Sequence, residues 1–75
     1  MKPNKEILIK FGEKIRELRV SQNLSQEQLS FKADLHRTYI GMIERGEKNI
    51  TLINIQKIAN ALNTEIKNLF DGITL

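Results

Sequence analysis

The feature that most constrains this chain is the stretch 25–45, SQEQLSFKADLHRTYIGMIER, which predicts two short helices joined by a tight turn. Ser25 can begin the first helix, because its hydroxyl can accept a hydrogen bond from the backbone amide three residues on. The side chain of Gln28 can reach back to the backbone amide of Ser25, which completes a capping box. The first helix should end near Asp34, a residue type that tolerates the left-handed backbone of a sharp turn.

The second helix is predicted to run from residue 36 or 37 to residue 45, where Gly46 ends it. At about 100° per residue, one side of this helix carries Ile40, Ile43 and Glu44. The opposite side is small, polar or basic and consists of Thr38, Gly41, Met42 and Arg45, with Arg37 and Tyr39 at its margins. Such a face suits the base edges of the DNA major groove, which carry hydrogen-bonding groups and thymine methyls. The stretch is therefore predicted to be a helix-turn-helix.

The rest of the chain also has helical periodicity. Further helices are predicted at 5–21 and 52–62, and a short one follows Thr64 and ends near Phe70; their N-termini could be capped by Asn4, Thr51 and Thr64. Their apolar stripes are Leu8, Phe11, Ile15 and Leu18, then Leu52, Ile55, Ile58, Ala59 and Leu62, then Ile66, Leu69 and Phe70. No strand pattern or repeat competes with this interpretation. The predicted fold is all-α, a single five-helix domain over 1–75, in which the helices at 52–70 complete the core.

Composition excludes several classes of protein. The absence of cysteine rules out a disulfide framework, and a single histidine argues against zinc, so no metal or cofactor is expected. Carboxylates scattered over helix surfaces do not suggest an enzyme. No apolar run approaches the roughly 20 residues of a membrane span, and a cytoplasmic protein is expected. The net charge of +3 is compatible with nucleic acid, and the excess lies in 1–24, as a solvated basic face or as a contact to flanking phosphates.

The motif LSQEQL, its spacing to HRTYIGMIERG and the following N-x-T-L stretch resemble the Cro- and phage-repressor-like helix-turn-helix family. Within that family, DLHRTYIGMIERGEKNITL is most similar to the controller proteins of bacterial restriction-modification systems. The resemblance implies a homodimer that binds a two-fold, double-stranded DNA operator and times the expression of its own gene and of the endonuclease. A phage-type repressor, or an antitoxin-type autoregulator that acts partly through a protein partner, is the alternative.

The resemblance also assigns DNA-binding roles to individual residues. Gln26 matches the phosphate-binding glutamine of the family, with a surface residue chosen for helix propensity as the alternative. Arg37 matches the arginine that reads bases in controller proteins, and a solvated arginine paired with Asp34 is the alternative. For Tyr39, a contact to the DNA backbone competes with partial packing in the core. The remaining expected DNA contacts are His36 at the helix start, Thr38 and Met42, and then Arg45, Lys48 and Asn49.

Two further sets of residues follow from the resemblance. Relatives pair an arginine late in the first helix with the glutamate of the recognition helix, here Arg19 and Glu44, and this pair would be structural. Dimerisation is expected through apolar residues away from the recognition helix, namely Ile50, Ile53, Phe70 and Ile73, with Leu75 near them. The alternative for Phe70 and Ile73 is that they complete the monomer core. A contact with RNA polymerase through carboxylates is also expected, with Glu13, Glu17 and Glu47 as candidates.

Overall fold

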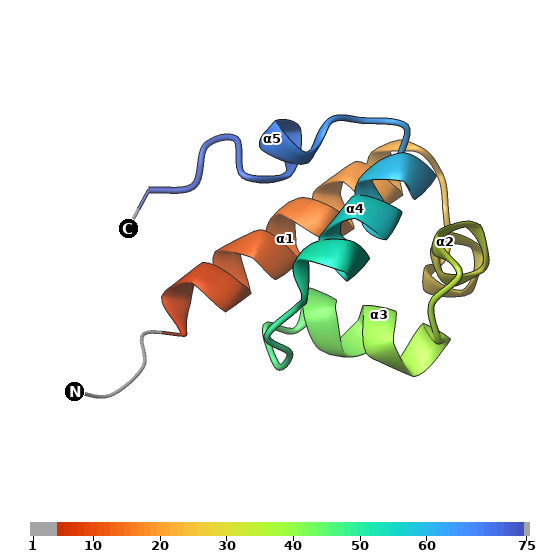
Figure 1. Ribbon diagram of the computed structural model, residues 1–75, viewed down its shortest axis with the longest axis horizontal. Coiled ribbons are helices and arrows are strands. Elements are labelled where there is room, and N and C mark those ends of the chain that lie inside the picture. Colours follow the sequence, from red (N-terminus) through yellow and green to blue (C-terminus); the bar gives the residue numbers. More distant parts are fainter. Residues whose placement is uncertain (1–4, 75) are drawn as a thin grey trace.

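The computed structural model describes residues 5–74, and within this part of the chain the only regular elements are helices. The helices are α1 Glu6–Ser21, α2 Gln26–Ala33, α3 Arg37–Glu44, α4 Leu52–Ala61 and α5 Ile66–Leu69. The long α1 passes behind α4, while α2 and α3 form an angled pair at one end (Figure 1). The predicted all-α fold of five helices is confirmed. No helix in this part of the chain has both the length and the apolar character that crossing a membrane requires.

The helix boundaries follow from local hydrogen bonds. The capping box is present: the amide of Gln28 donates to Ser25 Oγ over 3.0 Å, and the amide of Ser25 donates to Gln28 Oε1 over 2.7 Å. Asp34 ends α2 with φ 55°, in the left-handed region expected from its residue type. Thr51 caps α4 by accepting from the amide of Asn54. The start of the helix-turn-helix motif is thus fixed by its own sequence.

Two of the other predicted caps have different outcomes. The prediction for Thr64 is wrong, because Glu65 is the N-cap of α5 and its side chain makes no capping bond. Thr64 Oγ1 instead accepts from the side-chain amide of Asn68. Asn4 lies outside the described residues, and Lys5 precedes α1 without a side-chain cap.

A single apolar core joins α1 to the other helices. Its fully buried side chains are Ile15, Leu29, Ile40, Ile43, Ile58, Leu62 and Leu69. Each such side chain contributes about 1.5–3 kcal/mol by leaving water. Leu52 was predicted in the apolar stripe of α4, but it is 78% exposed, because it lies on the first turn of that helix beyond the edge of the core.

Gly12 allows α1 and α3 to approach each other closely. A Cβ atom at this position would lie 2.8 Å from the carbonyl oxygen of Glu44, and the carbonyl oxygen of Ile43 is nearer still. Both atoms belong to the backbone, so neither can move aside without shifting a helix. Gly12 therefore sets how deeply the end of α3 packs onto α1.

Candidate nucleic-acid interface

The last turn of α3 is locked to α1 by an ion pair. Arg19 Nε donates to Glu44 Oε2 over 2.6 Å and Arg19 Nη2 donates to Glu44 Oε1 over 2.9 Å, in the bidentate geometry of a strong pair. Arg19 Nη1 also donates to the carbonyl of Leu24, just before α2. The side chain of Glu44 is 3% exposed, and its hydrogen bond to Arg19 raises the pKa of the guanidinium. The pair holds α1, the start of α2 and the end of α3 together, in agreement with the structural role expected of it.

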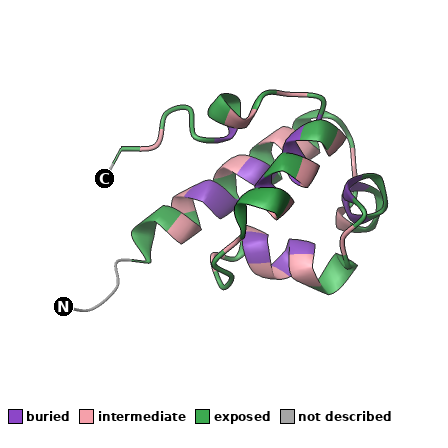
Figure 2. Ribbon diagram, viewed as in Figure 1, coloured by how far each residue is buried: buried purple, intermediate pink, exposed green. Residues whose placement is uncertain are grey.

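The beginning of α3, from His36 to Thr38, is by contrast exposed to solvent (Figure 2). His36 is the N-cap, and its Nδ1 accepts from the amide of Thr38 over 3.2 Å. Arg37 and Thr38 are exposed. None of the side-chain hydrogen bonds and ion pairs of residues 5–74 involves Arg37, so the alternative pairing with Asp34 is not formed. All N–H donors of Arg37 are therefore free, and the other end of its helix is fixed by the ion pair. Such an arginine is suited to bind the acceptors of guanine.

Gln26 is half-buried at the first position of α2, beside the ion pair. Its Nε2 donates to Glu44 Oε1 over 3.1 Å, which fixes the orientation of the amide group. The second amide hydrogen remains available to an acceptor. At this position the N-terminus of a helix, which favours anions, lies beside a side-chain donor. A contact to a DNA phosphate uses both.

Tyr39 joins α3 to α4. Its hydroxyl accepts from Asn54 Nδ2 over 3.0 Å, and its ring packs against the core while Lys48 Nζ lies 5.9 Å from the ring centroid. Core packing, the alternative weighed for this residue, is therefore present. Because the hydroxyl oxygen accepts the bond from Asn54, its own hydrogen is left to donate elsewhere. Lys48 and Asn49 are exposed in the loop after α3.

The outward face predicted for α3 needs one correction. Gly41 is buried rather than exposed, and Met42 is half-buried. The reason at Gly41 is that the side chains of Arg45 and Gln26 cover its backbone. Arg45 itself is exposed, and its Nε donates to Glu47 Oε2 over 2.9 Å. This hydrogen bond raises the pKa of Arg45 and lowers the pKa of Glu47.

The residues predicted at the dimer interface are of two kinds. Ile53 is 72% exposed on the first turn of α4, next to the exposed Leu52. Ile50 and Ile73 instead pack against the core. Phe70 is partly exposed, and the centroid of its ring lies 5.0 Å from that of Phe11. Leu75 lies outside the described residues.

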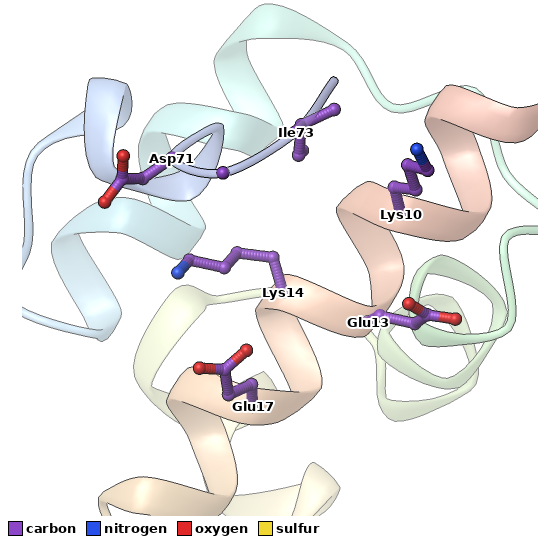
Figure 3. A pocket seen from close by; sticks show the side chains of 7 residues that line it. Lys10, Glu13, Lys14, Glu17, Asp71 and Ile73 are labelled. Atoms are coloured by element: carbon purple, nitrogen blue, oxygen red, sulfur yellow. The ribbon is translucent and has the colours of Figure 1, made fainter. Parts of the chain in front are cut away.

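The carboxylates considered for a polymerase contact do not all line one site. Glu13 and Glu17 lie on α1 in a groove that also contains Lys14 and, from the C-terminal segment, Asp71 (Figure 3). Lys10 and Ile73 complete the groove at its other end, where Lys10 donates to the carbonyl of Thr74. Glu47 does not line this groove. The mixed charges of the groove do not favour one sign of ligand.

Phe31 is an exposed aromatic residue that the sequence pattern does not reveal. It is 88% exposed on α2 and lines a shallow hollow that also contains Arg37 at the start of α3. Phe31 lies near the end of α2, and nothing in the sequence around it indicates that its side chain is exposed. The functional meaning of Gly12 was missed in the same way, since close approach of two helices leaves no local pattern.

The fold and this site together define a helix-turn-helix domain with an exposed, basic recognition helix. The helix-turn-helix family matches residues 15–69 of the chain. Control protein C.BamHI of Bacillus amyloliquefaciens is 51% identical over 70 residues, which are 92% of this chain and 86% of that protein. The crystal structure of the restriction-modification controller protein C.AhdI from Aeromonas hydrophila matches with a TM-score of 0.85 and 50% identity, over 85% of this chain and 97% of that one.

The restriction-modification controller protein C.Esp1396I, solved as a tetramer in complex with its natural 35 base-pair operator, matches with a TM-score of 0.81 and 32% identity. This likeness covers 88% of the present chain and 87% of that one. The chain therefore belongs to the helix-turn-helix family of DNA-binding transcriptional regulators, and its predicted similarity to controller proteins is confirmed.

Proposed function

We propose that this protein is the controller of a restriction-modification system, a homodimer that binds a two-fold operator upstream of its own gene. The observation that carries the proposal is the first turn of α3, where Arg37 and Thr38 are exposed and Arg37 is unpaired within the described chain. The operator complex of C.Esp1396I supports DNA as the ligand, since that relative has the same fold. Under this proposal the protein acts in the cytoplasm, where it binds its operator.

Dimerisation supplies the affinity that one short helix lacks. A recognition helix of eight residues touches few base pairs, and two-fold dimers place two such helices about 34–36 Å apart. Leu52 and Ile53 expose adjacent aliphatic side chains on α4, and the partly exposed Phe70 is a further apolar group. We assign the dimer contact to these residues together with the exposed parts of the half-buried Ile50 and Ile73. A contact with RNA polymerase through Glu13, Glu17 or Glu47 stays a prediction.

The test is DNA binding by the wild type and by Arg37→Ala, on the protein's own upstream DNA and on a scrambled duplex. Lys67→Ala is the matched control, because it also removes one positive charge, from an exposed position on α5. We expect the wild type to prefer the upstream duplex and Arg37→Ala to lose about 1–3 kcal/mol of that preference. Lys67→Ala should bind as the wild type does.

Salt dependence separates this function from the alternative. Affinity for the upstream duplex should fall steeply between two salt concentrations, because phosphate contacts release counterions. Equal, weak binding of the wild type to both duplexes would contradict the proposal. A protein partner bound with little dependence on salt would then favour the antitoxin-type role, for which the exposed Phe31 is the surface to test.

A further inference from the structure

We propose that Glu47 is a positioning residue for DNA binding, which holds the guanidinium of Arg45 across the bare backbone of Gly41 and toward Gln26. Arg45 would then meet a DNA phosphate already in its bound orientation. This inference rests on the DNA-binding function proposed above, and it deepens that function by adding an acidic residue to a site that is otherwise basic and polar.

A hydrogen bond joins the side chains of Arg45 and Glu47. Arg45 Nε donates to Glu47 Oε2 over 2.9 Å, although Arg45 is 57% and Glu47 is 51% exposed. Only the Nε side of the guanidinium is used, because the side chain of Arg45 forms no other hydrogen bond within residues 5–74. The two terminal nitrogens, which carry four N–H groups, remain for an acceptor such as a phosphate.

The side chain of Arg45 runs across Gly41 toward Gln26. A Cβ atom on Gly41 would lie 3.1 Å from Arg45 Nη1 and 3.6 Å from Gln26 Oε1. The end of the guanidinium therefore lies over Gly41 and next to the first residue of α2. Gln26 is held in turn by Glu44, so the two groups that flank this point come from oriented side chains.

The negative charge of Glu47 makes its effect on DNA binding informative. A carboxylate next to a phosphate-binding arginine repels the DNA, so by Coulomb's law alone its removal should strengthen binding. Holding Arg45 in place has the opposite effect. Immobilising one flexible side chain on association weakens binding by roughly two- to twelvefold, and a side chain that is ordered beforehand avoids this loss. The two explanations thus predict opposite changes for the same substitution.

The experiment is a double-mutant cycle on the upstream duplex, with wild type, Glu47→Ala, Arg45→Ala and the double variant. We expect Glu47→Ala to weaken binding by roughly two- to twelvefold when Arg45 is present. In the Arg45→Ala background, the loss of Glu47 should leave the affinity unchanged or raise it. A purely structural role of Glu47 would not depend on Arg45 in this way.

Two further variants sharpen the test. Glu47→Gln keeps an oxygen that can accept from Arg45 Nε, and its affinity should lie closer to the wild type than that of Glu47→Ala. Glu65→Ala, which removes a carboxylate paired with an exposed lysine on α5, should not alter binding. Melting temperatures of all variants show whether each remains folded.

The inference is overturned if Glu47→Ala binds as tightly as the wild type, or more tightly, while Arg45 is present. It is also overturned if Glu47→Ala weakens binding equally in both backgrounds. Failure of the proposed function gives a different result, since the wild type would then show no preference for the upstream duplex over a scrambled one.

Discussion

Replacing Glu44 by glutamine should destabilise the protein strongly, because the change leaves the charge of Arg19 without its partner. Glu44 is 3% exposed and Arg19 is 11% exposed, so neither charge has much access to water. Removing one partner of a buried pair costs about 3–5 kcal/mol. We expect about 3 kcal/mol, the lower end of that range, because Arg19 keeps its hydrogen bond to the carbonyl of Leu24.

The measurement is thermal unfolding followed by circular dichroism. In a domain of this size, 1 kcal/mol corresponds to about 4–8 °C, so the melting temperature of Glu44→Gln should fall by about 12–24 °C. Glu65→Gln makes the same chemical change in an exposed pair, whose Oε2 lies 3.4 Å from Lys67 Nζ, and it should melt as the wild type does. Replacing both partners, as Arg19→Met with Glu44→Leu, should recover at least half of the loss.

Two results would refute this reasoning. A melting temperature of Glu44→Gln within about 4 °C of the wild type would show that the pair is not effectively buried. A double variant no more stable than Glu44→Gln would show that the loss comes from the missing hydrogen bonds of Glu44, including the one from Gln26, rather than from a stranded charge.

Other substitutions test packing at three positions. Gly12→Ala should lose about 1–3 kcal/mol in urea unfolding, because its Cβ atom would meet the backbone of Ile43 and Glu44. Tyr39→Phe should lose about 0.5–1.5 kcal/mol in the same assay through the missing bond from Asn54, and a larger loss would mean that other bonds are broken. Phe31→Ser should change stability by no more than about 0.5 kcal/mol, since the side chain is almost fully exposed; a larger change would show that Phe31 packs in solution.

The sequence predicts the helix-turn-helix well because the signals are local. The capping box needs only Ser25 and Gln28, and the turn needs only the conformational tolerance of Asp34. Helical periodicity finds Ile40 and Ile43 because both face the core from the same side of α3. Each of these features depends on residues within about one turn of one another, so tertiary structure does not override them.

Several features that the sequence did not reveal depend on how the helices pack or on where the core ends. Leu52 has the spacing of a core position, but the first turn of α4 extends past the core. Gly41 lies on the outward side by angle, and the side chains of Gln26 and Arg45 bury it. The constraint at Gly12 comes from carbonyl groups more than 30 residues away. Periodicity states which way a position points, but the neighbouring elements determine what covers it.

The two ends of α3 therefore separate stability from recognition. Its last turn is fixed by Arg19 and Glu44, so variants there should unfold more easily, and those that remove Glu44 also release the side chain of Gln26. Its first turn carries Arg37 without a partner in the described chain, so Arg37→Ala should melt as the wild type does and lose sequence preference. A recognition helix needs both properties, since base contacts are selective only when the backbone that presents them is fixed. Loss of binding in a Glu44 variant has meaning for recognition only if it is measured below the melting temperature of that variant.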